Sequence, residues 1–300
     1  MKEKICIHLI PTYKNIYSDK YTFYNAADTS VGDLAQYDRL LEKLAYQYEI
    51  NQIIIDGGEI SNLSDLYFDL LYKIVKLYTT NIKICTSFKT FNSSLINGTD
   101  VITVKYNFIK DETIFKNIKA AIQIGKIINI ETFDIACINE NPIELITQLN
   151  KLNIKTFEII PYIKTKYTNT LLNYMSDIFE KSILNLLPYT NEMNFAFYNK
   201  LQLDGLIINN NYEQQTIYIT PNNKYAIENY TTDFFELIEL DDLSLLISTL
   251  QKQKELQKEY CRNCHVKLKC MANYYKPFIK AKDSSCDFSK LIYQYSAKKE

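Results

Sequence analysis

Short apolar segments alternate with amphipathic segments over the first two-thirds of the chain. In the amphipathic segments the apolar residues recur every three or four positions, as on one face of a helix. This pattern predicts strands at 4–10, 52–56, 82–86, 101–106, 127–137 and 155–162, and helices at 33–48, 66–78, 113–124 and 142–152. Such alternation is typical of parallel strands joined by crossover helices. We therefore predict an α/β fold in which six strands form a partial (β/α)6 TIM-like barrel.

The pattern changes after about residue 200. Antiparallel strands are expected at 203–208 and 216–220, and Pro221-Asn222-Asn223 is a favourable turn into a further strand at 224–227. A charged amphipathic helix is expected at 240–259, and a cysteine-rich tail follows it. The predicted domains are a barrel at 1–200 and a small cysteine-rich, metal-binding domain at 201–300.

Composition excludes several classes of partner. The 300 residues include 34 basic and 35 acidic side chains, so the net charge of −1 gives the protein as a whole no electrostatic attraction for nucleic acid. No segment approaches the roughly 20 apolar residues of a membrane span. The apolar start at 5–11 is interrupted by His8 and lacks the build of a signal peptide. We therefore expect a cytoplasmic protein that binds neither nucleic acid nor membranes.

The seven cysteines fall into two groups. In a reducing compartment, this many cysteines indicate metal binding or redox chemistry rather than disulfide bonds. Cys6, Cys85 and Cys137 each lie in an apolar strand segment, and we expect them to be small core residues. The other four lie in the last 40 residues of the chain.

The spacing of the C-terminal cysteines suits one metal centre. Two residues separate Cys261 from Cys264, so both can bind one metal from a single turn, while Cys270 and Cys286 close the site from a distance. Four thiolates suit tetrahedral zinc or an iron–sulfur cluster, and the spacing alone does not distinguish them. His265 could replace a thiolate in a zinc site. The alternative interpretation is four thiols in a small apolar subdomain.

Together with the sequence before it, this tail resembles the SPASM domain of radical S-adenosylmethionine peptide maturases. That domain holds two auxiliary [4Fe–4S] clusters, and the resemblance implies that Cys261, Cys264, Cys270 and Cys286 bind the second of them. Tyr274 stands where the family has a ligand of the first cluster, and no cysteine lies between 137 and 261 to supply its other ligands. The resemblance therefore implies one [4Fe–4S] cluster, with zinc as the alternative.

The N-terminal region resembles the barrel of the same enzymes, but it lacks their cluster-binding thiols. In the family, a C-x3-C-x2-C motif follows the first strand, often after a tripeptide similar to Pro11-Thr12-Tyr13. Asn15, Asp19 and Thr22 stand at the expected cysteine positions. The radical reaction needs three thiolates to hold a cluster with one open iron. We therefore expect no radical cleavage of S-adenosylmethionine.

Gly57, Gly58 and Glu59, which follow the second predicted strand, resemble the Gly-Gly-Glu motif that receives the amino group of S-adenosylmethionine in this family. The resemblance marks these three residues as a degenerate cofactor-binding motif. A plain structural interpretation is also open. Two glycines permit a sharp turn after a strand, and Glu59 can cap the helix that follows.

Three functions remain open after the sequence is considered. The resemblance favours a radical-inactive, iron–sulfur-binding SPASM-type protein of a ribosomal peptide (RiPP) maturation system. It would bind a precursor peptide or a partner modifying enzyme such as an ATP-grasp ligase. The second is an active peptide-modifying enzyme that uses the remaining cluster or the barrel pocket, with His8, Asp19 and Glu59 as candidate residues. The third is a zinc-stapled binding protein.

An extended peptide is expected to bind either at the barrel mouth or along the hairpin at 216–227. An exposed edge strand offers unpaired backbone groups to which a peptide can add as another strand. Tyr218 and Tyr225 would then line pockets for its side chains. The competing expectation is that these tyrosines only pack the small domain.

Overall fold

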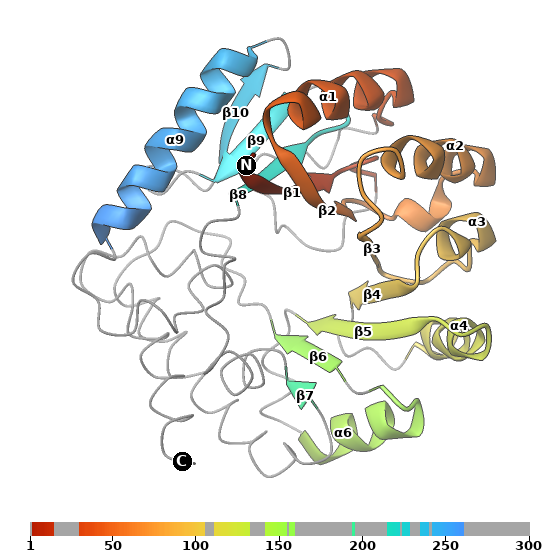
Figure 1. Ribbon diagram of the computed structural model, residues 1–300. Coiled ribbons are helices and arrows are strands. Elements are labelled where there is room, and N and C mark those ends of the chain that lie inside the picture. Colours follow the sequence, from red (N-terminus) through yellow and green to blue (C-terminus); the bar gives the residue numbers. More distant parts are fainter. Residues whose placement is uncertain are drawn as a thin grey trace. The chain divides into compact units, whose positions relative to one another are not determined.

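Strands and helices alternate along the chain in the computed structural model (Figure 1). The structure describes residues 2–14, 30–105, 111–132, 142–154, 156–159, 194–195, 215–222, 224–228, 235–239 and 242–260. The chain divides into two compact units. The first consists of 1–105, 111–128 and 211–256, and the second of 106–110, 129–210 and 257–300.

The first unit is built on a mostly parallel sheet. Its strands are β1 (Lys4–Leu9), β2 (Glu49–Ile55), β3 (Ile82–Thr86), β4 (Val101–Lys105), β8 (Gln215–Ile219), β9 (Lys224–Glu228) and β10 (Phe235–Glu239). They are ordered β10-β9-β8-β1-β2-β3-β4. The strands from β8 through β1 to β4 run parallel, while β9 is antiparallel to both β8 and β10. In the second unit, β6 (Thr156–Ile159) pairs in parallel with β5 (Ile127–Thr132) and β7 (Asn194–Phe195).

The described helices are α1 (Leu34–Gln47), the 3-10 helix η1 (Ile60–Asn62), α2 (Asp65–Val75), α3 (Ser93–Asn97), α4 (Glu112–Gln123), α6 (Pro142–Lys151) and α9 (Leu243–Tyr260). Polar side chains cap several of their N-termini. Asp33 accepts hydrogen bonds from the N–H groups of Ala35 and Gln36, and Ser64 accepts one from Tyr67. These caps satisfy backbone donors that a helix leaves open at its start.

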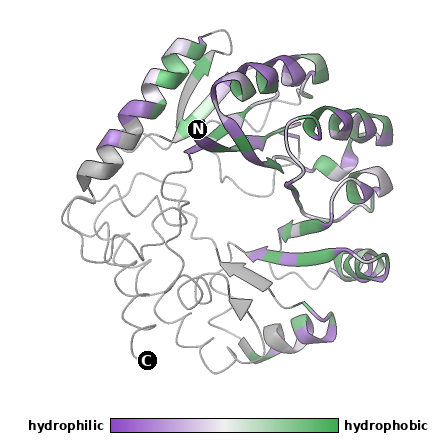
Figure 2. Cartoon of the chain, in the orientation of Figure 1, coloured by the Kyte–Doolittle hydropathy of each residue, from purple (hydrophilic) through white to green (hydrophobic). Residues whose placement is uncertain are grey.

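The core of the first unit lies between the sheet and its helices. On β1, Ile5, Ile7 and Leu9 are at most 1% exposed, as expected for alternate residues on one face of a strand. Helices α1, α2 and α4 carry both hydrophobic and hydrophilic residues, because one side packs on the sheet and the other meets solvent (Figure 2). Tyr37 on α1 donates a hydrogen bond to the Ile10 carbonyl at 2.9 Å, and burial raises the pKa of Tyr37 well above its ordinary value.

The mixed α/β fold with a parallel sheet agrees with the sequence prediction. All four predicted N-terminal helices are present, and the predicted strand starts and ends shift by a few residues. The hairpin of β8 and β9 is also confirmed. The elements that the pattern missed are η1, α3, β7 and β10. The predicted strand at 203–208 lies outside the described residues, and the domain division at residue 200 stays a prediction.

Among the described residues, no helix combines the length and the apolar character that crossing a membrane requires.

Candidate functional site

The two glycines after β2 form a turn that packs directly on the segment after β1. Gly57 has a φ of 132°, and a Cβ there would lie 2.8 Å from the Thr12 carbonyl oxygen. A Cβ on Gly58 would lie 2.3 Å from the carbonyl oxygen of Lys14. The Gly58 N–H donates to the Thr12 carbonyl at 2.7 Å, and the Glu59 N–H donates to Lys14 at 2.8 Å. Glycine is therefore required here both by conformation and by the close approach of two backbones.

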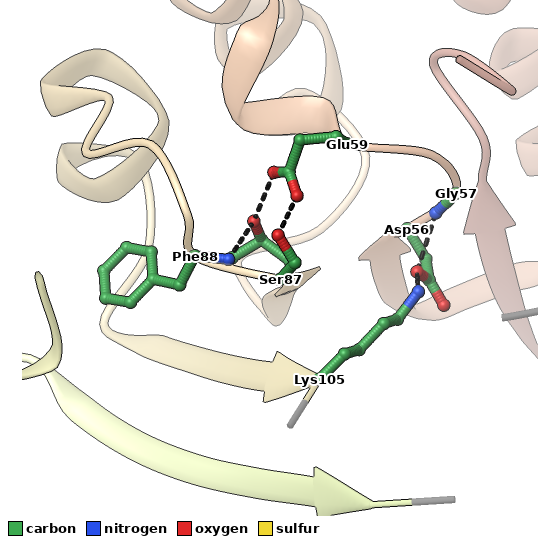
Figure 3. Close-up of polar contacts among 7 residues, drawn as sticks. Asp56, Gly57, Glu59, Ser87, Phe88 and Lys105 are labelled. Atoms are coloured by element: carbon green, nitrogen blue, oxygen red, sulfur yellow. Dashed lines mark hydrogen bonds and ion pairs between the residues drawn. The ribbon is translucent and has the colours of Figure 1, made fainter. Parts of the chain in front are cut away.

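Glu59 is buried, with 3% of the residue exposed, and its carboxylate is surrounded by donors. One carboxylate oxygen accepts hydrogen bonds from the Ser61 N–H at 3.3 Å, from the Ser61 hydroxyl and from the Thr86 hydroxyl at 3.1 Å. The other oxygen accepts one from the Ser87 hydroxyl (Figure 3). Glu59 is also the N-cap of η1, so the plain interpretation of this motif, a sharp turn followed by a cap, is confirmed.

The hydroxyls of Thr86 and Ser87 also connect the loop after β3 to Glu59. Thr86 and Ser87 donate to the carboxylate and accept from the N–H groups of Phe88 and Lys89, at 3.1 and 3.4 Å. Phe88 is fully buried and has a φ of 61°, a conformation that is a genuine outlier for a bulky residue. Backbone strain of this kind costs about 1–3 kcal/mol and persists only where the surroundings enforce it. The hydroxyl bonds to Glu59 are part of that enforcement.

A buried ion pair lies at the start of the same turn. Lys105, the last residue of β4, pairs with Asp56, which directly follows β2 (Figure 3). The side chain of Lys105 is 7% exposed and that of Asp56 is fully buried. Asp56 also accepts a hydrogen bond from the Gly57 N–H at 2.6 Å. The Lys105 ammonium therefore neutralises the Asp56 carboxylate, and that carboxylate in turn holds the first residue of the Gly-Gly turn.

Sequence reasoning missed Asp56 and Lys105 as site residues. Each is a charged residue that directly follows a run of β-branched residues at the carboxyl end of a strand, and this is the signal that could have found them. Their pairing depends on β3, which pairs with β2 on one side and with β4 on the other. Thr86 and Ser87 were missed too, because an ordinary Thr-Ser dipeptide after a strand gives no signal of its own.

His8 lies within β1, opposite Tyr218 of β8 in the parallel register. The two rings are 4.7 Å apart between centroids and are tilted by 45°. His8 is partly buried. Its position inside the strand agrees with a packing role, and Asp19, a further candidate catalytic residue, lies outside the described residues.

The hairpin of β8 and β9 does not offer the exposed edge that the sequence suggested. Strand β8 lies between β1 and β9, and β9 lies between β8 and β10. Tyr218 is 5% exposed and Tyr225 is fully buried. The prediction of an edge lined by tyrosine pockets is therefore wrong. The competing expectation is confirmed as far as the tyrosines are buried, but they pack in the sheet of the first unit rather than in a separate small domain. The cause is the parallel pairing of β8 with β1, a contact between residues about 210 positions apart.

The predicted metal ligands Cys261, Cys264, Cys270 and Cys286 lie outside the described residues. Within the described ranges, no three His, Cys, Asp or Glu side chains gather as a metal site would require. Two of the three cysteines expected in the core, Cys6 and Cys85, are buried as predicted, with 8% and 2% exposure. Cys137, Asn15 and Thr22 also lie beyond the described part of the chain.

The Glu59 carboxylate is engaged by its neighbours, and its assignment as an acceptor for the S-adenosylmethionine amino group stays a prediction. A carboxylate offers about four acceptor sites, two on each oxygen. From the described residues Glu59 accepts four hydrogen bonds, three on one oxygen and one on the other, all from neutral donors. The turn at Gly57 and Gly58, which positions this carboxylate, is fully formed.

No family model matches the sequence, and no curated protein matches it. Similarity appears at the level of structure. SuiB from Streptococcus suis bound to S-adenosylmethionine superposes with a TM-score of 0.59 at 16% identity, over 95% of this chain and 76% of SuiB. SuiB bound to its precursor peptide SuiA gives a TM-score of 0.60 with the same coverage. Native anSMEcpe with bound AdoMet gives 0.70 at 11% identity, over 98% of this chain and 97% of that one.

The chain therefore shares its fold with SuiB and anSMEcpe, two proteins that have been solved with S-adenosylmethionine bound. The predicted fold class, an α/β partial barrel, is confirmed by the same comparison. At these identities, the similarity concerns the fold alone.

Proposed function

We propose that the protein is a radical-inactive component of a ribosomal peptide maturation system, which binds a precursor peptide or a partner modifying enzyme. Its fold is that of SuiB, which has been solved with the precursor peptide SuiA, and of anSMEcpe, which has been solved with the Cp18Cys peptide. The proposal assigns this chain the peptide-binding part of that behaviour without the radical step. An ATP-grasp ligase is the partner enzyme that the SPASM resemblance suggests.

The observation that carries the proposal is the buried Glu59 carboxylate, which accepts hydrogen bonds from the hydroxyls of Ser61, Thr86 and Ser87. A site that receives an ammonium group must keep an accessible acceptor for it. Here the carboxylate is buried and stabilises the loop after β3 instead. This agrees with the sequence after β1, where three non-thiol residues replace the cysteines that would hold a radical cluster.

We assign the metal site to Cys261, Cys264, Cys270 and Cys286, with one [4Fe–4S] cluster as the preferred occupant and zinc as the alternative. Four thiolates hold either centre without leaving an open coordination position. A closed site of this kind stabilises the fold around it, because structural metal binding is coupled to folding. Its role here is structural.

The peptide site is assigned to the carboxyl ends of the parallel strands, since the hairpin is enclosed. In parallel α/β folds, ligands bind at this end of the sheet, on the loops that follow the strands. The loop after β3 offers exposed Lys89 and Thr90, followed by Phe91, which is 39% exposed. The ring of Phe91 is supported by Phe88 at 6.0 Å between centroids. An aromatic side chain held in this way is a suitable anchor for an apolar peptide residue.

The first test addresses the radical chemistry. Protein reconstituted anaerobically with iron and sulfide is incubated with S-adenosylmethionine and dithionite, and 5′-deoxyadenosine is measured by liquid chromatography. We expect none above the level of protein without reductant. A matched variant, Asn15→Cys with Asp19→Cys and Thr22→Cys, shows whether thiols alone restore cleavage. Catalytic formation of 5′-deoxyadenosine by the wild type would overturn the proposal and favour an active peptide-modifying enzyme.

The second test addresses peptide binding. The precursor peptide encoded beside the gene is titrated calorimetrically into the full chain, and Phe91→Ala is expected to raise Kd about tenfold. Leu245→Ala is the matched control, because Leu245 is 43% exposed on α9 and not on a strand-end loop. If neither the peptide nor a modifying enzyme encoded nearby binds, the binding role is wrong. Iron, sulfide and zinc analysis of the same anaerobic sample identifies the metal.

A further inference from the structure

The outer face of helix α2 carries a row of exposed leucines. Leu66 is 67% exposed, Leu70 is 40% exposed, and Leu77, just beyond the helix end, is 75% exposed. At 100° per residue these three positions fall within an arc of about 40°. The opposite face of α2 is buried against the core and consists of Phe68, Leu71, Tyr72 and Val75. Helix α2 is therefore apolar on two opposite sides.

The neighbouring helices of the same unit do not share this feature. The exposed positions of α1 are Ala35, Arg39, Glu42, Tyr46 and Gln47, and those of α4 are Glu112, Thr113, Lys116, Lys119 and Gln123. Apart from Tyr46, these outer faces are polar or small. A solvent-facing helix normally places charged residues there. An exposed row of three leucines on one helix alone indicates a surface that another molecule covers.

Charged residues flank the leucine row in a fixed order. Asp65 and Asp69 lie in the N-terminal half of α2, and Lys73 and Lys76 lie in its C-terminal half or directly after it. All four are exposed, and at 100° per residue all lie on the same side of the row. The acidic half and the basic half are thus complementary to each other when the helix is turned end to end.

We propose that a second copy of this chain docks on the leucine row, with its own α2 antiparallel to the first. A two-fold axis at the level of Leu71 and Tyr72 brings Leu66 opposite Leu77 of the second copy. The same axis brings Asp69 within one residue, about 1.5 Å along the helix, of the level of Lys73 of the second copy, twice by symmetry. Contacts between identical patches in this reciprocal pattern define an isologous interface. The antiparallel arrangement also sets the helix dipoles favourably against each other.

The size of the surface sets the expected strength of the dimer. A helix of 11 residues is about 16 Å long. Two such faces bury less than the roughly 1,200 Å² of a standard interface, so the dimer belongs to the weak class. We expect a Kd on the order of 10 μM.

Sedimentation velocity tests the proposal on the full-length protein between about 1 and about 200 μM. The weight-average mass should rise with concentration towards twice that of the monomer. The double variant Leu66→Gln, Leu77→Gln should stay monomeric over the whole range. Ile124→Gln is the matched control, since Ile124 is 53% exposed outside α2, and it should associate like the wild type. Thermal melts by circular dichroism check that each variant is folded.

The charge pattern gives an independent arm. Asp69→Lys replaces two attractive contacts with two repulsive ones and should raise Kd about tenfold. Adding Lys73→Asp restores the opposite charges and should return Kd to the wild-type range. A wild type that is monomeric throughout, or leucine variants that still associate, would overturn the proposal. A monomer whose binding to a modifying enzyme requires Leu66 and Leu77 would also overturn it, and would assign the row to that enzyme.

Discussion

Asp56 and Glu59 are two buried carboxylates on one turn, three residues apart, and the protein stabilises them in different ways. Asp56 is neutralised by the ammonium group of Lys105, with one further bond from the Gly57 N–H. The donors that the described residues supply to Glu59 are neutral, namely three hydroxyls and one backbone N–H. The Asp56 carboxylate depends on the charge of one partner, Lys105. The Glu59 carboxylate is held by several neutral donors, each of which can be replaced.

This difference separates a structural position from an adaptable one. An isolated buried charge is very costly, so an ion pair in the interior constrains both of its residues together. Hydroxyl donors can rotate and can exchange one partner for another. A carboxylate that is bonded by hydroxyls, such as Glu59, can therefore gain or lose partners through few substitutions. Phe88, with its strained backbone, belongs to the part of the loop that these hydroxyl bonds hold.

The largest effect is expected at the ion pair. Lys105→Met leaves the Asp56 carboxylate buried without its cation, and we expect a loss of about 3–5 kcal/mol in the free energy of unfolding. Urea denaturation followed by circular dichroism measures it. Adding Asp56→Asn removes the uncompensated charge and should recover much of the loss. A single variant as stable as the wild type would show that the ion pair does not stabilise the fold.

The next effect concerns the turn that carries both carboxylates. Gly57→Ala forces a side chain into a positive φ and into overlap with the Thr12 carbonyl and Ile10, so a loss of about 3 kcal/mol is expected. Gly125→Ala is the matched control, because Gly125 has a φ of 84° but nothing within 4 Å of its Cβ position. That change should cost about 1 kcal/mol. Equal losses in the two denaturation curves would show that the close approach at Gly57 is unimportant.

A smaller effect is expected at Glu59 itself. Glu59→Gln keeps one acceptor oxygen but removes the charge that strengthens the hydroxyl bonds, and a loss of about 2 kcal/mol is expected. Asp56→Asn should cost more than this, because it strands the Lys105 ammonium rather than neutral hydroxyls. Comparing the two isosteric changes under the same denaturation conditions tests the contrast directly. The reverse order would mean that Glu59, not Asp56, is the fixed position.

The sequence predicted the local parts of this region better than its long-range parts. Strand–helix alternation gave the sheet, and the Gly-Gly dipeptide gave the turn, since both follow from backbone preferences of neighbouring residues. The Asp56–Lys105 pair was missed because its residues lie 49 positions apart and meet only through the pairing of β2, β3 and β4. The prediction of an exposed edge at the hairpin of β8 and β9 was wrong for the same reason. Only the register of β8 against β1 shows that it is enclosed.

The smallest stability effect, and the sharpest test of the contrast, is expected from Ser87. Ser87→Ala removes the donor that the described residues supply to one oxygen of Glu59, and it should cost about 1 kcal/mol. That oxygen is then left without a described donor, whereas the Asp56 carboxylate stays paired with Lys105. We therefore expect Ser87→Ala, combined with Ser61→Ala, to bind S-adenosylmethionine measurably by calorimetry, whereas the wild type does not. Ser248→Ala is the control, because the Ser248 hydroxyl donates to the Leu245 carbonyl on α9, and it should change neither stability at Glu59 nor cofactor binding.

Binding by the wild type would show that an ammonium group already displaces its hydroxyls. Absence of binding in the folded double variant would show that the lost affinity has its cause elsewhere, at the residues that replace the cluster thiols.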